Sequence, residues 1–135
     1  MKEQLLTHLE NSRNYMLEVM EKMPESMYDF KPVNTVWNFK ELANHIAYGI
    51  TWWQDNYILK TETEWNPPAI AHTKAETISR LEDAYESLKK AMGSIPITDE
   101  IMIGFFSTCN HITHHRGQMV SYLRCNNVTA PEYNF

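Results

Sequence analysis

The sequence predicts an all-helical protein that folds as a four-helix bundle. Four segments carry apolar residues at intervals of three and four, the spacing that places them on one face of an α-helix. Glycine and proline are scarce, with 4 and 6 among 135 residues, and no segment alternates as a half-buried strand does. Amphipathic helices bury their apolar faces around a shared core, and this length suits a single domain over residues 1–135.

Two helices are expected in the first half of the chain, at residues 2–23 and 38–60. Pro24 ends the first, because proline lacks the amide hydrogen that a helix interior needs. Asn38 begins the second, because its side chain can accept from free amides of the first turn and Glu41 completes a capping box. The apolar faces comprise Leu5, Leu9, Ser12, Met16, Val19 or Met20, and Met23 in the first helix, and Leu42, Ile46, Gly49 and Trp53 in the second.

Two further helices are expected at residues 73–93 and 98–124. Thr73 and Glu76 repeat the capping box, and Gly93 is expected to end the third helix in a left-handed conformation. The apolar faces comprise Ile78, Leu81, Tyr85, Leu88 and Met92 in the third helix, and Ile101, Phe105, Thr108, Ile112, His115, Met119 and Leu123 in the fourth. The longest connections lie before and after the second helix, so the helices need not simply alternate up and down.

Charge and composition exclude several classes of function. The formal net charge is -5 with no basic stripe, which argues against binding to nucleic acid or to anionic membranes. The longest apolar run, residues 46–53, falls far short of the ~20 residues that span a membrane. No signal peptide is recognisable at the start, so we expect a cytoplasmic protein. Cys109 and Cys125 would lie roughly 24 Å apart on one helix, too far for a disulfide, which fits a reducing compartment.

The histidines are the most informative residues. His111 and His115 are four positions apart, so on a helix their imidazoles stack one turn apart and can hold one metal ion between them. The alternative is a pair of surface or capping histidines. His114 lies roughly 140° from the centre of the apolar face and is expected to point outward. His8 and His72 are also expected to face solvent.

A third metal ligand should come from another helix that faces the same interior. His45 lies beside Ile46 on the second helix, about 80° from the centre of its apolar face. This border position mirrors that of His111. The alternative is a partly buried histidine bonded to a backbone carbonyl.

Two motifs together resemble the DinB-like family, which includes the YfiT-type proteins. They are the segment from Trp37 to Ile46, with its capped helix start and first histidine, and the run His111-x-x-x-His115-Arg116-Gly117-Gln118. The resemblance covers nearly the whole chain. It implies a four-helix bundle, often a homodimer, in which His45, His111 and His115 bind one divalent transition metal, zinc or nickel.

The resemblance allows a metal-dependent enzyme, either a hydrolase or a transferase that uses a low-molecular-weight thiol, acting on a small molecule. Three protein ligands leave a position open for water or thiolate, as in catalytic zinc sites. Glu41 is a candidate general base or only the helix cap. Trp52 and Trp53 either line a pocket or pack in the core or at an interface, and Arg116 either orients an anionic substrate or forms a salt bridge. Gln118 can fix a histidine tautomer or bond to a helix end.

The alternative function is a non-catalytic metal-binding or interaction bundle. An enzyme should show a concave pocket over the open coordination position. A non-catalytic bundle should have that position filled by side chains.

Overall fold

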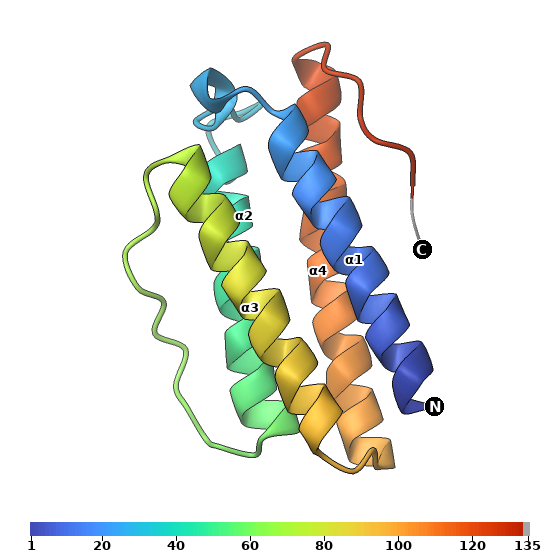
Figure 1. Cartoon of the computed structure of the whole chain (residues 1–135). Helices are drawn as coiled ribbons and strands as arrows, with labels where there is room; N and C mark the ends of the chain where they lie inside the picture. Colours follow the sequence, from blue (N-terminus) through green and yellow to red (C-terminus); the bar gives the residue numbers. More distant parts are fainter. Residues whose placement is uncertain (134–135) are drawn as a thin grey trace.

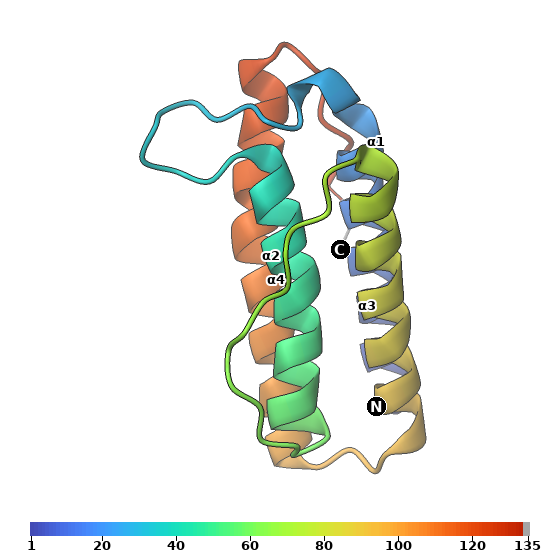
Figure 2. The ribbon, with the colours of Figure 1, turned by 90° about the vertical axis from the view of Figure 1, so that its left-hand side faces the viewer.

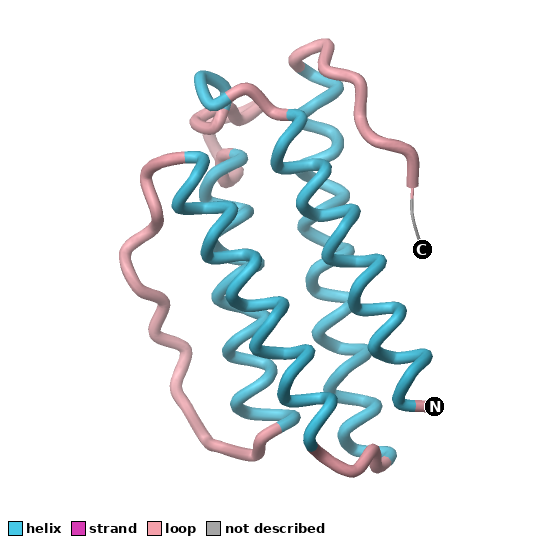
Figure 3. Tube along the Cα trace, in the orientation of Figure 1, coloured by secondary structure: helices cyan, strands magenta, loops and turns pink. Residues whose placement is uncertain are grey.

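The computed structural model describes residues 1–133, and these residues contain helices and no strand (Figure 3). The predicted fold class is therefore confirmed. The elements are α1 (Lys2–Lys22), a short 3-10 helix η1 (Glu25–Met27), α2 (Phe39–Trp53), a π-helical turn η2 (Gln54–Ile58), α3 (Lys74–Ser94) and α4 (Asp99–Cys125). None of the helices in residues 1–133 combines the length and the apolar character that a membrane span requires.

The four long helices do not alternate in direction. Helices α1 and α4 run one way, and α2 and α3 run the other way side by side (Figures 1 and 2). A parallel pair needs a connection that travels back along the full length of a helix. Residues 59–73, here called the crossover segment, make this return along the outside of α2 and α3 (Figure 1). Fifteen extended residues reach up to roughly 50 Å, more than the roughly 22 Å of a fifteen-residue helix.

The predicted helix starts of α2 and α3 are confirmed by their caps. The Asn38 side chain accepts from the Glu41 amide, and the Glu41 carboxylate accepts from the Asn38 amide, both at 2.7 Å. Thr73 and Glu76 form the same reciprocal pair at the start of α3. These bonds satisfy amides that have no partner within the helix, so the sequence signal and the structure agree on where each helix begins.

The prediction for Gly93 is wrong. Helix α3 continues through Gly93 to Ser94, and none of the glycines has a positive φ. The helix ends where Ile95 adopts an extended conformation, at φ -110° and ψ 155°. The following residue is Pro96, whose ring disfavours the helical conformation of the residue before it.

The core lies where the predicted faces of the helices meet. Every predicted face residue of α1 is buried, as are Leu81, Tyr85, Leu88 and Met92 of α3. Helix α2 is shorter than expected: it is α-helical to Trp53, and η2 then closes its last turn through the Leu59 amide and the Gln54 carbonyl.

Candidate metal centre

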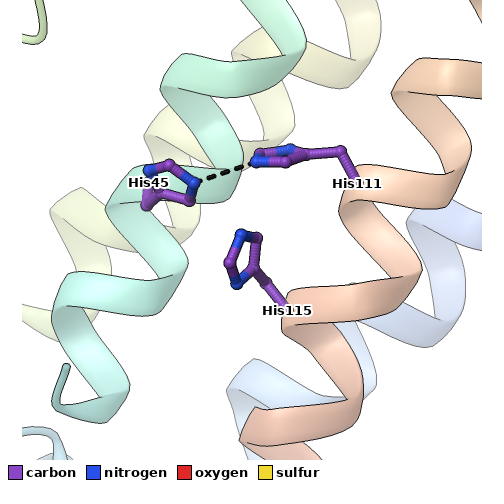
Figure 4. A group of neighbouring side chains, drawn as sticks. All are labelled: His45, His111 and His115. Carbon is purple, nitrogen blue, oxygen red and sulfur yellow. Dashed lines mark hydrogen bonds between the residues drawn. The ribbon is translucent and has the colours of Figure 1, made fainter. Parts of the chain in front are cut away.

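Three histidine side chains from two helices converge between α2 and α4. His45 projects from α2, and His111 and His115 project from successive turns of α4 toward it (Figure 4). One nitrogen of each ring lies within 4.8 Å of the other two. The closest pair is His45 Nε2 and His111 Nε2, at 2.9 Å. The structure thus brings together the three residues that the helical spacing selected.

The position of His111 depends on a glycine in the facing helix. The His111 ring lies against Gly49 of α2, where an added Cβ would be 2.5 Å from Cε1 and 2.9 Å from Nδ1. A glycine inside a helix costs about 1 kcal/mol relative to alanine. Sequence reasoning placed Gly49 on the apolar face of its helix but gave it no role in the site. An internal helical glycine one turn beyond His45 was the available signal.

The surroundings keep the three imidazoles neutral. Burial is the main cause of each shift: it lowers the pKa of His45 from 6.5 to about 4, with a further contribution from the charge of His115. The pKa of His111 is lowered to about 4 by burial and then by the charges of His45 and His115. The pKa of His115 is also lowered, chiefly by burial. Neutral imidazole is the form that binds a metal.

Hydrogen bonds arrange the ring nitrogens for a shared ion. His115 Nδ1 lies 2.8 Å from Gln118 Oε1, so it donates to the amide oxygen and leaves Nε2 free to bind a metal. His111 Nδ1 is buried and has no hydrogen-bond partner among the described residues. Two ligands at ~2.1 Å from one tetrahedral ion are roughly 3.4 Å apart. The His45 and His111 nitrogens, at 2.9 Å, would therefore open slightly to hold zinc or a similar ion, and the wider pairs, within 4.8 Å, would close. The donor set therefore fits a divalent transition metal.

Two tryptophans flank the histidine cluster. The Trp37 ring lies 4.5 Å from the His45 ring and 5.9 Å from the His115 ring, measured between centroids. Trp65 of the crossover segment lies 5.4 Å from His45. The Trp37 carbonyl accepts a 2.7 Å hydrogen bond from the Tyr122 hydroxyl, which holds the residue against α4. Sequence reasoning assigned neither tryptophan to the site, although Trp37 directly precedes the helix cap before His45.

Glu41 and Gln118, which the sequence also suggested for the site, lie near the histidine cluster, and the side chain of each is engaged in a hydrogen bond. Glu41 caps α2, and its carboxylate accepts from the Asn38 amide at 2.7 Å. Gln118 is bonded to His115, which is the tautomer-fixing arrangement considered from the sequence. His114 is exposed on α4, as expected, and so are His8 and His72.

The structure places Arg116 away from the histidine cluster. Its side chain is 5% exposed, its guanidinium lies 4.5 Å above the Tyr15 ring, and Nη1 donates to Ser12 Oγ at 3.4 Å. Arg116 therefore points toward α1. Its place one turn after buried Ile112 on the helical wheel was the signal for burial.

Trp52 and Trp53 belong to an aromatic cluster at the end of α2. Trp53 stacks on Tyr57 at 4.6 Å, and Trp52 packs edge-on against Trp53 and Trp65. The Trp52 indole donates to the Thr63 carbonyl at 3.2 Å. Trp52 thus supports Trp65 and the crossover segment, whereas Trp37 and Trp65 contact His45 directly.

A cleft of about 850 Å³ adjoins the cluster. It lies between α2, α3 and the crossover segment, and His45, Trp37 and Trp65 are among the residues that line it. His45 therefore faces both the other histidines and a hollow large enough for a small molecule.

Comparison with known proteins agrees with this architecture. The DinB family matches residues 1–100, a range that includes His45 and ends before His111. A DinB-like protein of known structure from Bacillus cereus has 18% identity and a TM-score of 0.81, over 97% of this chain and 96% of that chain. A DinB-like protein from Bacillus subtilis has 18% identity and a TM-score of 0.75, over 97% and 98% of the two chains. At this identity the similarity concerns the fold, and comparison with curated proteins gave no match. Because the family match spans most of the chain, the protein belongs to the DinB family.

Proposed function

We propose that this protein is a metal-dependent enzyme in which His45, His111 and His115 hold one divalent transition metal, zinc or nickel. The observation that carries the proposal is the convergence of three neutral imidazoles beside a cleft. Three protein ligands leave room for a fourth, and His45 lines the cleft from which that fourth ligand would arrive. A structural metal site would instead be closed by a fourth side chain.

The chemistry follows from a cation bound by uncharged ligands. Such a metal, when bound, lowers the pKa of a water or thiol at its open position and so supplies a nucleophile near neutral pH. Glu41, the base considered from the sequence, is engaged in the capping box of α2. We therefore assign the activation of the nucleophile to the metal itself. Hydrolysis and transfer to a low-molecular-weight thiol can both proceed from such a nucleophile.

The cysteines support a cytoplasmic setting for such a reaction. Within the described residues, Cys109 is a buried free thiol and Cys125 an exposed free thiol. Free thiols persist in reducing compartments, where low-molecular-weight thiols are also available as co-substrates. We therefore propose that the protein acts in the cytoplasm.

Metal stoichiometry in variants tests the site. Protein purified without added metal should carry about one ion per chain, and His45→Ala, His111→Ala and His115→Ala should each lose most of it. His114→Ala is the matched control and should keep the metal, because His114 is exposed on the outer side of α4. Loss of metal in the control with retention in His111→Ala or His115→Ala would overturn the ligand assignment.

A turnover assay separates the enzyme from a non-catalytic metal protein. Metal-loaded wild-type protein would be screened with activated esters for hydrolysis and with electrophiles plus a low-molecular-weight thiol for transfer. The three-alanine variant of His45, His111 and His115 gives the background rate. A wild-type rate equal to that background across both panels, with metal bound, would favour the non-catalytic alternative.

A further inference from the structure

The cleft beside His45 exists because small side chains meet on two parallel helices. Its floor includes Ala47 and Thr51 of α2 together with Ala84 and Ser87 of α3. Larger residues at these positions would fill the seam between the helices. The α2 residues that line it lie on one face of the helix between Glu41 and Thr51, over a length of roughly 15 Å.

The crossover segment forms a fixed roof over this floor. The Asn66 amide donates to the Tyr48 hydroxyl at 2.8 Å, and the Ala71 amide donates to Asn44 Oδ1 at 2.9 Å. Between these two attachments the segment contains Pro67 and Pro68, which line the cleft and whose rings restrict the backbone. A roof attached on both sides keeps the hollow open without a ligand, which lowers the entropy lost on binding.

The charges around the cleft disfavour an anionic ligand. Arg80 supplies the positive charge of the lining, and its Nη1 donates to the Ala69 carbonyl at 2.7 Å and to Asn44 Oδ1 at 3.1 Å. One nitrogen of the guanidinium is therefore already engaged by the protein itself. Asp83 and Glu41 place carboxylates in the same lining, so a negatively charged tail would be repelled.

The walls suit a flat apolar group. Trp37 and Trp65 both pack against the His45 ring, at 4.5 and 5.4 Å between centroids, and Tyr48 packs edge-on against Trp65 at 4.7 Å. Aromatic and proline side chains offer large apolar faces to a ring, and stacking adds to the gain from burial. We propose that the cleft binds an uncharged aromatic or alicyclic part of the substrate, while a donor group at its other end reaches the metal beside His45.

This inference rests on the proposed metal site, and paired hydroxamates test the two separately. Acetohydroxamate and 2-naphthohydroxamate share one metal-binding head and differ in the ring, and 6-carboxy-2-naphthohydroxamate adds a negative charge. Each would be titrated into the zinc-loaded protein by calorimetry. We expect the naphthyl compound to bind at least about tenfold more tightly than acetohydroxamate, through apolar burial. The carboxylated compound should lose most of that gain.

Two variants locate the ring in the cleft. Ser87→Trp places an indole into the floor from an exposed position on α3, and Trp65→Ala removes a wall. Both should abolish most of the naphthyl advantage, measured as the ratio of the two affinities. Ser87→Trp should also leave acetohydroxamate binding unchanged, because Ser87 lies on α3, whereas Trp65 contacts the His45 ring and is compared by the ratio alone. Ala75→Trp is the matched control, because Ala75 is an exposed residue near the start of α3, and it should retain the full advantage.

The outcomes distinguish the two proposals. If acetohydroxamate fails to bind the zinc-loaded protein, the proposal that the metal has an open coordination position is wrong. If acetohydroxamate binds but the naphthyl ring brings no gain, or the gain survives Ser87→Trp and Trp65→Ala, the assignment of the cleft is overturned.

Discussion

Gly49→Ala should remove the metal while leaving the fold intact. The new Cβ would lie 2.5 Å from His111 Cε1 and 2.9 Å from Nδ1. Carbon atoms pack at about 3.5–4.0 Å, so the ring must retreat by about 1 Å. Metal–ligand distances tolerate only about 0.2 Å, so His111 would no longer reach an ion shared with His45 and His115. We expect metal affinity to fall by more than about 100-fold, beyond the loss caused by removing a residue that only orients a ligand.

The stability of the metal-free Gly49→Ala variant should stay close to that of the wild type, although its metal affinity falls. Alanine in place of glycine inside a helix contributes about 1 kcal/mol. The atoms that clash are at the end of a side chain, so His111 can turn aside, and the cost of moving its half-buried ring opposes the helix gain. Because the two effects offset each other, the metal-free variant should unfold at about the same denaturant concentration as the metal-free wild type. The assay pairs chemical denaturation with the visible spectrum of bound cobalt, which reports the ligands directly.

The other glycines provide matched controls. A Cβ at Gly93 or Gly117 would meet nothing within 4 Å, so alanine at either position should leave metal binding unchanged. Gly117 lies in the interior of α4, where alanine should raise stability by about 1 kcal/mol, and Gly93 lies in the last turn of α3, where the gain should be smaller. A Cβ at Gly104 would lie 2.9 Å from Tyr57 Cβ, so Gly104→Ala should lower stability and keep the metal. Wild-type cobalt affinity in Gly49→Ala would refute the argument that the missing side chain makes room for the ring.

Four further results are expected. In the metal-free protein, the pKa of His45 and His111 is about 4 when folded against 6.5 when unfolded, so the unfolded state binds more protons between these values. The free energy of unfolding should therefore fall as pH drops from 6.5 toward 4, and a rise on acidification in denaturation curves would contradict this. Gln118→Ala should weaken metal affinity by about 10–100-fold by freeing the His115 ring, measured by competition with a chelator. Glu41→Ala should lower the unfolding free energy by about 1 kcal/mol and leave metal content unchanged, and metal loss would show that it does more than cap α2. Light scattering should give the mass of a homodimer, since Trp37 remains 47% exposed and aromatic residues are enriched at interfaces; a monomer at micromolar concentration would count against it.

Local sequence signals determined the helices. The starts of α2 and α3 followed from capping boxes, in which Asn38 with Glu41 and Thr73 with Glu76 interact over three residues. Apolar periodicity identified the buried face of each helix for the same reason, because it depends on the helical repeat alone. The end of α3 was predicted at the wrong residue, because a glycine such as Gly93 can also continue a helix. The helix ends one residue later, where Pro96 disfavours the helical conformation of Ile95.

The histidines show how far helical geometry reaches. The four-residue spacing of His111 and His115 placed their side chains one helical turn apart. Their angles from the centre of the apolar face distinguished them from His114, which was expected to point outward and is exposed. The border position of His45 made it a candidate for the same interior. That it meets His111 at 2.9 Å depends on how α2 packs against α4.

Only the tertiary structure decided which residues far apart in the chain lie against one another. The contact of Gly49 with His111, the position of Trp65 against His45, and the cleft beneath the crossover segment all require the helices to be placed relative to one another. A helical wheel gives the direction of a side chain about its own axis. It carries no information on which neighbour stands in that direction, because that depends on the packing of helices and on the path of the segments between them. The sequence alone therefore determined the fold class and the candidate ligands, while the space around them was decided by packing.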